Sequence, residues 1–399
     1  CWMSTMTDIT DRKHMEDALR EKQSRLDLAL QSAQMGAWHW DIIKDKRVFS
    51  SKACQLLGIN PAEFNGIKFF DQEGKKLSES IEAKIETAVD SQEDLPEILD
   101  NTIKTDDDTL ISLYSTHLKD SINNITFDKT KLVLDCANGA TSTIAPQLFE
   151  ELGFDIDTIC CQPNGKNINQ DCGATAPGET FRLVKKTEET IGVTFDGDGD
   201  RLIMVDHKGE KVDGDEIVYV IAKAWKKNGE LKSNTVVGTK MTNLGMRNAL
   251  KESGMKFIEA DVGDRHVMDQ LIKNKAILGG EGSGHIICLN KSTSGDAIIA
   301  ALQVLEIIAK SGQSLFDLKS RMTKYPQVLI NIKTQKKINL SDSKLIEVIR
   351  SVESKLTDTG RVLVRESGTE SLVRVMVECA EYDLAEESAK HISKTIQSM

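Results

Sequence analysis

The 399-residue chain carries 51 basic and 62 acidic residues, a formal net charge of −11, and 39% of its residues are hydrophobic. This length predicts roughly two to four domains with enough apolar residues for their cores. The acidic balance argues against a nucleic-acid-binding surface, because phosphate backbones require a basic face. The longest apolar stretch, 297–309, contains Gln303 and Glu306 and is too short to span a bilayer.

The cysteine pattern indicates a reducing compartment. Eight cysteines are scattered along the chain, and only Cys160 and Cys161 are near neighbours. This spacing fits neither a zinc-binding motif nor a disulfide framework, so we expect reduced thiols in a cytoplasmic protein. The sequence opens with Cys1 and without a signal-peptide pattern, which we interpret as part of a longer reading frame.

The first 60 residues differ from the rest of the chain. A polar, amphipathic helix pattern over 8–33 precedes a short strand pattern at 35–41 and a short helix pattern at 49–58. This segment, residues 1–59, resembles the end of one PAS sensor module, its linker helix and the start of a second module. The pattern stops after one strand and one short helix, so an amphipathic helix without a sensing role is the favoured alternative.

From Lys131 to Lys310 short apolar strands alternate with amphipathic helices. Such alternation predicts parallel α/β sheets with helices on both faces. We expect strands at 131–135, 191–195, 202–206, 234–238, 256–262 and 276–279, and helices at 143–152, 215–227, 243–252 and 295–310.

The last segment has a different order of elements. We expect a strand at 327–333, a helix at 343–356, strands at 361–364 and 372–377, and a helix at 384–399. This order predicts a small, separate α+β domain that begins near the Tyr325-Pro326 break.

The strongest sign of chemistry is the loop Thr194-Phe-Asp-Gly-Asp-Gly-Asp-Arg201. Three aspartates leave a buried strand at two-residue steps, and the intervening glycines allow the carboxylates to converge: Asp196, Asp198 and Asp200. Three hard oxygen ligands with an open position suit Mg²⁺. An EF-hand loop is excluded, because it requires Gly where Arg201 stands and Glu where His207 stands. A solvated acidic turn is the structural alternative.

Two further glycine-containing loops also follow strands. The first carries an acceptor, a hydroxyl and an imidazole at alternate positions, which suits hydrogen bonding to sugar hydroxyls: Glu281, Ser283 and His285. The second forms a predicted anion nest: Arg365, Ser367, Gly368 and Thr369. No lysine follows in the P-loop spacing. An ordinary turn is the alternative in both cases.

Together and in this order, the loops resemble those of the α-D-phosphohexomutase family, over residues 60–399. The resemblance implies a multidomain α/β protein with mixed or parallel sheets, a C-terminal α+β domain, and one loop from each of four domains at a central cleft. We therefore expect a PAS-like segment and four mutase domains over 1–60, 61–120, 121–230, 231–326 and 327–399.

The resemblance also implies roles for individual residues. Asp196, Asp198 and Asp200 would bind Mg²⁺, with Arg201 beside them in the catalytic loop. Lys68 would match the proposed general acid/base. The remaining matched residues would bind the sugar (Glu281, Ser283, His285 and Arg265) and its non-reacting phosphate (Arg365, Ser367, Gly368 and Thr369). Glu366 stands where the family usually places proline.

Within the family, the runs Pro163–Asn169, Cys172–Thr175 and Thr293–Ala297 resemble the bacterial phosphoglucosamine mutases. This implies exchange of glucosamine 6-phosphate and glucosamine 1-phosphate through glucosamine 1,6-bisphosphate, for cell-wall precursors. The expected partner is a small phosphosugar, without nucleic acid or membrane, in a homodimer. Gly282 matches neither this branch nor the phosphomannomutase/phosphoglucomutase branch, which stays the alternative.

One departure affects activity. The family's nucleophile lies in a Ser-His-Asn-Pro motif, and here Gly58-Ile59 precede Asn60-Pro61 with the spacing to Lys68 retained. Because glycine carries no hydroxyl for a phosphate, we expect this chain to be inactive. Two other hypotheses stay open: a non-catalytic phosphosugar-binding module fused to a sensor segment, and an artefactual join at Asn60-Pro61.

Overall fold

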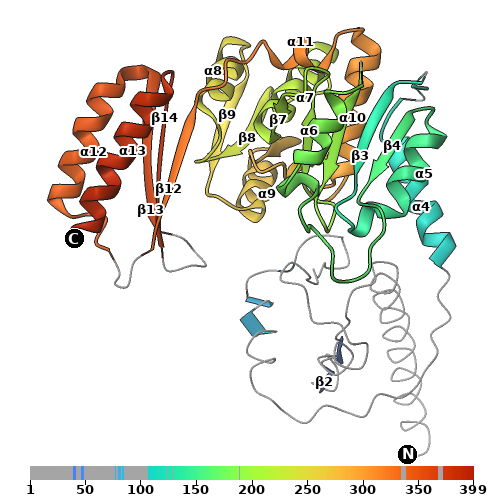
Figure 1. The fold of residues 1–399 in the computed structure, drawn as a ribbon, viewed down its shortest axis with the longest axis horizontal. Coiled ribbons are helices and arrows are strands. Elements are labelled where there is room, and N and C mark those ends of the chain that lie inside the picture. The colour runs from blue at the N-terminus through green and yellow to red at the C-terminus, as the bar shows by residue number, and fades with distance from the viewer. Residues whose placement is uncertain are drawn as a thin grey trace, which may run out of the picture. The chain divides into compact units, whose positions relative to one another are not determined.

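The structure is a computed structural model (Figure 1). It describes residues 39–41, 46–48, 77, 80–81, 83–84, 107–123, 125–127, 129–187, 189–333, 338–366 and 372–399. The chain divides into two compact units, which are described separately: unit 1 comprises Cys1–Val212 and Ser283–Leu315, and unit 2 comprises Asp213–Gly282 and Phe316–Met399.

Little of the first 106 residues is described. Strands β1 (His39–Asp41) and β2 (Lys46–Val48) form an antiparallel hairpin in which His39 lies opposite Val48. The rest of the PAS-like segment lies outside the described residues, and so do Gly58 and Lys68. The PAS resemblance and the expected remnant at 61–120 therefore stay predictions.

Unit 1 contains a five-stranded mixed sheet in the order β4-β3-β5-β6-β7. Its strands are β3 (Lys131–Asp135), β4 (Asp155–Ile159), β5 (Ile191–Phe195), β6 (Leu202–Val205) and β7 (Lys211–Val212). Strand β3 pairs in parallel with β4 and β5, whereas β5, β6 and β7 pair antiparallel. This mixed sheet agrees with the predicted fold class of mixed or parallel sheets, although its antiparallel part departs from the parallel pairing that the strand–helix alternation alone suggests. Only six residues join β5 to β6, and a parallel crossover needs about a dozen.

Four α-helices lie entirely within the described residues of unit 1: α4 (Asp107–Asp120), α5 (Ile144–Glu151), α6 (Gly178–Val184) and α10 (Ala297–Ser311). Helix α6 contacts β3, β5 and β6, and α10 contacts β5, β6 and β11 (Ile286–Cys288). The side chain of Asp296 accepts a hydrogen bond from the Ile299 amide and so caps α10. Asp296 also accepts a hydrogen bond from Tyr114 of α4, which ties these two helices together.

Unit 2 contains parallel strands β8 (Thr235–Thr239), β9 (Lys256–Ala260) and β10 (Leu278–Gly280), with β8 between the other two. Helices α7 (Gly214–Asn228), α8 (Leu244–Glu252) and α9 (Asp264–Lys273) pack against these strands. Helix α7 begins at a capping box formed by Asp213 and Glu216 and ends at Gly229 in the left-handed region. It contacts β10 and α8, so it packs with the segment that we expected at 231–326.

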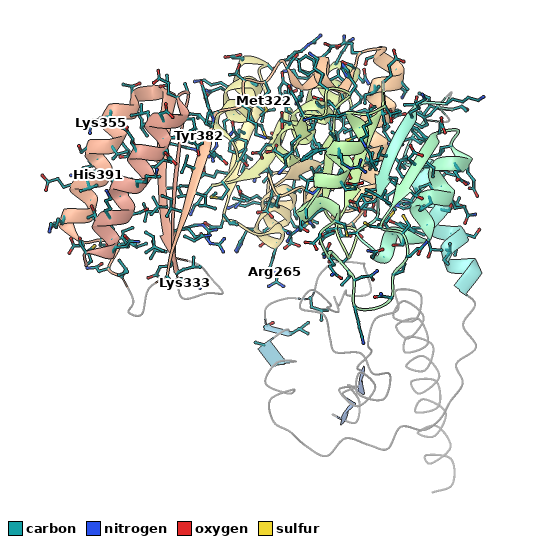
Figure 2. All side chains as sticks on the ribbon, viewed as in Figure 1. Arg265, Met322, Lys333, Lys355, Tyr382 and His391 are labelled. Carbon is teal, nitrogen blue, oxygen red and sulfur yellow. The ribbon has the colours of Figure 1, made fainter. Side chains whose placement is uncertain are left out.

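The C-terminal part of unit 2 is a small α+β domain, as expected. Strands β12 (Gln327–Lys333), β14 (Leu372–Cys379) and β13 (Gly360–Glu366) form an antiparallel sheet in that order. Helices α12 (Ser343–Leu356) and α13 (Tyr382–Gln397) lie together on one side of it (Figure 1). Their exposed faces carry Lys355 and His391 (Figure 2). Across all the described ranges, every helix is too short or too polar to cross a membrane.

Candidate active site

Residues 196–201, called the metal-binding loop below for the role that we predict, begin where the fully buried strand β5 ends. Oδ1 of Asp196 accepts hydrogen bonds from the backbone amides of Asp200 and Arg201, each at 3.1 Å. The Gly199 amide donates to the Asp196 carbonyl at 3.2 Å, with Gly199 at a positive φ of 74°. The Asp196 side chain thus organises the turn that carries the other two acids.

The three aspartates of this loop converge as the sequence predicted. One oxygen from each carboxylate of Asp196, Asp198 and Asp200 lies within 4.8 Å of the others. Asp196 is buried and Asp198 is exposed, so the group is open to solvent on one side. Burial, and then the charges of Asp198 and Asp200, raise the pKa of Asp196 to about 7. Concentrated negative charge on hard oxygen atoms fits a divalent cation such as Mg²⁺.

Two basic side chains of unit 1 lie beside these carboxylates: Arg201, at the end of the loop, and His285. Nε of Arg201 lies 3.7 Å from Oδ2 of Asp196 and 3.9 Å from Oδ1 of Asp200. Nδ1 of the buried His285 lies 3.4 Å from Oδ2 of Asp200. We predicted a sugar-binding role for His285, and the structure places it against the metal-binding loop. Ser283, from the same run, is exposed.

The loop that follows β3 contacts the backbone of the metal-binding loop. The Ala140 amide donates to the Gly197 carbonyl at 2.8 Å. A Cβ at Gly139 would lie 2.2 Å from that same carbonyl oxygen. The run Asn138-Gly-Ala is a weak signal alone, because its contact with Gly197 appears only once β3 and β5 are neighbours.

In unit 2, Glu281, for which we predict a sugar-binding role, follows β10. Its Oε1 accepts a hydrogen bond from the Gly263 amide at 3.0 Å, just before α9. Arg265 stands in the first turn of α9, and its side chain projects away from the ribbon (Figure 2). This hydrogen bond holds Glu281 against the start of α9, the helix that carries Arg265.

Among the four predicted phosphate-binding residues, the structure describes Arg365 alone. Arg365 lies opposite Arg374 in the β13–β14 pair, and burial followed by the charge of Arg374 lowers the pKa of Arg365. The charge of Glu281 acts on Arg365 in the opposite direction. Nε of Arg365 is buried and, within the described residues, has no hydrogen-bond partner. Ser367, Gly368 and Thr369 lie outside the described residues.

Arg374 was missed by sequence reasoning. Two like charges directly opposite each other in a sheet are destabilising unless something separates or neutralises them. A buried, unpartnered Nε beside a second guanidinium suits an anion. The nine-residue offset between Arg365 and Arg374 could have indicated this pair, had the hairpin register been known.

The raised pKa of Asp196 predicts pH-dependent Mg²⁺ binding. A carboxylate must be ionised to bind the cation, so protonation below about pH 7 competes with Mg²⁺. One competing proton makes binding about tenfold weaker at pH 6 than at pH 8. Calorimetric titration at both values measures this difference.

Asp196→Asn is the matched variant, because it removes the competing proton. We expect it to bind Mg²⁺ more weakly than the wild type and with little change between pH 6 and pH 8. Equal wild-type affinities at the two pH values would show that Asp196 is not a ligand with a raised pKa.

Comparison with known proteins identifies the class. Residues 112–209, 213–325 and 329–395 match α/β/α domain II, α/β/α domain III and the C-terminal domain of phosphoglucomutase/phosphomannomutase, in that order. With the relatives below, these matches show that the chain belongs to the phosphohexomutase family of isomerases. The predicted family and multidomain α/β fold are confirmed.

Two curated relatives are phosphoglucosamine mutases. The one from Ruthia magnifica subsp. Calyptogena magnifica is 50% identical over 347 residues, covering 84% of this chain and 76% of the relative. The one from Vibrio campbellii is 45% identical over 341 residues, covering 85% and 76%. The chain's sequence similarity therefore points to the phosphoglucosamine mutase branch.

A solved structure supports the fold. The crystal structure of Aspergillus fumigatus N-acetylphosphoglucosamine mutase, in complex with GlcNAc-6P and magnesium, is 22% identical with a TM-score of 0.62. The match covers 72% of this chain and spans 65% of that protein's length.

Proposed function

We propose that this chain is a phosphoglucosamine mutase by descent, which binds Mg²⁺ and glucosamine 6-phosphate or 1-phosphate. The observation that carries the proposal is the convergence of Asp196, Asp198 and Asp200 at the end of β5, in a chain 50% identical to a phosphoglucosamine mutase. We place its role in the supply of amino-sugar phosphate in the cytoplasm.

In this proposal the three aspartates hold the cation, which when bound supplies positive charge to neutralise the transferring phosphoryl group. Arg201 lies beside two of the ligands, where its guanidinium can orient a phosphate oxygen. Glu281 and Arg265 bind sugar hydroxyls, and Lys68 moves a proton at the reacting hydroxyl.

The non-reacting phosphate binds at Arg365, together with Ser367, Gly368 and Thr369. The buried, unpartnered Nε of Arg365 supports this assignment, since a buried donor gains most from a charged acceptor. The opposing Arg374 increases the local positive charge. Phosphoryl transfer itself requires a carrier, and Gly58 stands where the family has its serine. We therefore propose binding without turnover for the chain as printed.

Binding of glucosamine 6-phosphate tests the proposed function. We expect Arg365→Ala to weaken binding by about 1.5–3 kcal/mol, the range for a hydrogen bond to a charged group. Calorimetry with the wild type measures the reference affinity. Arg350→Ala is the matched control, because Arg350 is exposed on α12 of the same domain. An Arg365→Ala affinity equal to that of the control would remove Arg365 from the phosphate site.

A further inference from the structure

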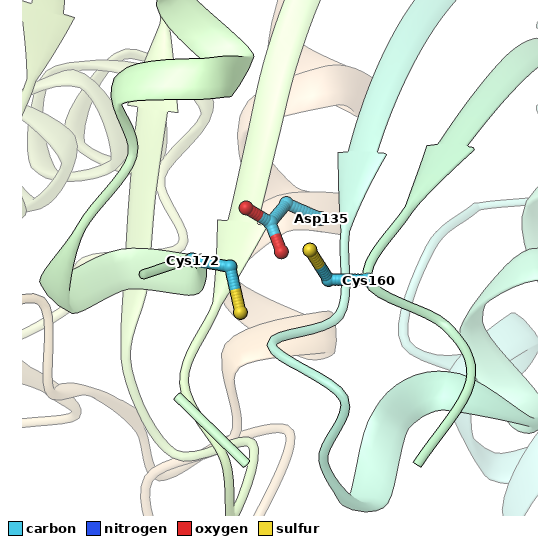
Figure 3. A group of neighbouring side chains, drawn as sticks. All are labelled: Asp135, Cys160 and Cys172. Carbon is cyan, nitrogen blue, oxygen red and sulfur yellow. The ribbon is translucent and has the colours of Figure 1, made fainter. Parts of the chain in front are cut away.

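Three side chains that the proposed function does not use meet at the carboxyl ends of β3 and β4. Asp135 is the last residue of β3, Cys160 follows β4, and Cys172 directly precedes a short 3₁₀ helix, Gly173–Thr175. One ligand atom from each lies within 4.8 Å of the others. In Figure 3 the Cys160 sulfur points towards the Asp135 carboxylate. The sequence spacing of these cysteines gave no sign of a site, because the three residues come from three separate segments of the chain.

The protein holds the Asp135 carboxylate in a fixed position. Its Oδ1 accepts from the Ala137 amide at 3.0 Å, and its Oδ2 accepts from the Gly173 amide at 2.8 Å and from the Thr180 hydroxyl at 3.5 Å. Asp135 is fully buried, and within the described residues no lysine, arginine or histidine forms an ion pair with it. A buried charge of this kind is normally paired or bound to a metal.

The donor set selects the kind of cation. Two sulfurs and one carboxylate oxygen suit a thiophilic divalent ion, above all Zn²⁺, whereas Mg²⁺ prefers oxygen alone. Donors that hold a ligating carboxylate from behind are a common feature of such sites. Cys160 is half-buried, which leaves an approach from solvent and room for water as a fourth ligand. Nδ2 of Asn138 lies 3.9 Å from the Cys172 sulfur and donates to it.

We propose that Asp135, Cys160 and Cys172 form a binding site for Zn²⁺ or a similar thiophilic cation, separate from the metal-binding loop at residues 196–201. The site lies on the segments that support that loop. A Cβ at Gly173 would approach the Phe195 carbonyl within 2.5 Å, and Phe195 directly precedes Asp196. The Asn169 amide also donates to the Ala137 carbonyl at 2.9 Å. A cation at the thiol site therefore fixes the two loops against which the metal-binding loop rests.

Co²⁺ is the probe, because bound thiolates give it a charge-transfer absorption that carboxylates do not. The full chain is reduced with a phosphine, freed of metal with a chelator, and titrated. We expect one equivalent to bind with this absorption, and Zn²⁺ to displace it. Loss of a protein ligand should weaken binding by more than about 100-fold, since loss of an outer partner alone costs 10–100-fold.

Four variants separate the possible outcomes. Cys160→Ser and Cys172→Ser should lose the absorption, while Cys288→Ser, which removes another buried thiol of unit 1, should keep it. Asp198→Ala should also keep the absorption, because the metal-binding loop supplies no thiolate ligand. Circular dichroism confirms that each variant is folded.

Two results would overturn the proposal. One is a reduced wild type that binds no Co²⁺ with thiolate absorption, even if the same two cysteines, Cys160 and Cys172, form a disulfide when the protein is exposed to air. The other is an absorption that persists in both Cys160→Ser and Cys172→Ser, which would place the thiolate ligands elsewhere.

Discussion

Supplied with glucosamine 6-phosphate, Mg²⁺ and glucosamine 1,6-bisphosphate, the 399-residue chain is expected to form glucosamine 1-phosphate no faster than a protein-free control. Phosphoryl exchange in this family requires a side chain that carries the phosphate, and Gly58 has none. In the proposed site, Mg²⁺ held by the three aspartates would position a phosphate together with Arg365, but neither would replace a covalent carrier. A coupled assay for glucosamine 1-phosphate, on protein freed of host mutase, measures the rate.

The double variant Gly58→Ser with Ile59→His restores the two motif residues. It does not restore the family sequence around them, because residues 1–59 resemble a PAS segment instead. We expect it to stay far below an intact phosphoglucosamine mutase assayed in parallel, because a misplacement of about 1 Å can cost on the order of 100-fold. Turnover by the unmodified chain near that of the intact enzyme would contradict the proposal. Phosphopeptide mapping would then locate the residue that carries the phosphate.

The sequence predicted the local parts of the site well. Strand β5 was readable as a buried apolar run, and Asp196, Asp198 and Asp200 follow it at a spacing that only a curled loop can bring together. The strand at 191–195 agrees residue for residue with the structure, because its five residues are all buried. Features of this kind depend on neighbours in the chain, so periodicity and spacing are sufficient.

Features that depend on strand order could not be predicted in the same way. Cys160 lies 25 positions after Asp135 and Cys172 lies 12 positions further on. Cys160 meets Asp135 because β3 pairs with β4, and the Gly173 amide brings the segment of Cys172 to the same carboxylate. The position of His285 is a second case: residues 285 and 201 form an isolated β-bridge that brings the imidazole to Asp200, whereas its predicted role at the sugar stays a prediction. Long-range pairing of this kind leaves no periodic signal in the sequence.

A single methyl group at Gly139 is expected to damage the metal-binding loop. The Cβ of Gly139→Ala would lie 2.2 Å from the carbonyl oxygen of Gly197 and 2.6 Å from its Cα. Both are backbone atoms, so the loop itself must move. Gly139 has a φ of −111°, which alanine adopts freely, so the effect comes from crowding and not from the backbone conformation. We expect a loss of about 1–3 kcal/mol in the free energy of unfolding.

The same displacement should weaken Mg²⁺ binding by about tenfold or more, since 1.4 kcal/mol corresponds to a factor of ten. Denaturant unfolding and calorimetric Mg²⁺ titration measure the two effects. Gly178→Ala is the matched control, because a Cβ there meets no atom within 4 Å. It should leave Mg²⁺ binding unchanged and leave stability equal or about 0.4–1 kcal/mol higher, since alanine reduces the freedom of the unfolded chain. If Gly139→Ala bound Mg²⁺ as tightly as Gly178→Ala, the close backbone contact would not control the geometry of the three aspartates.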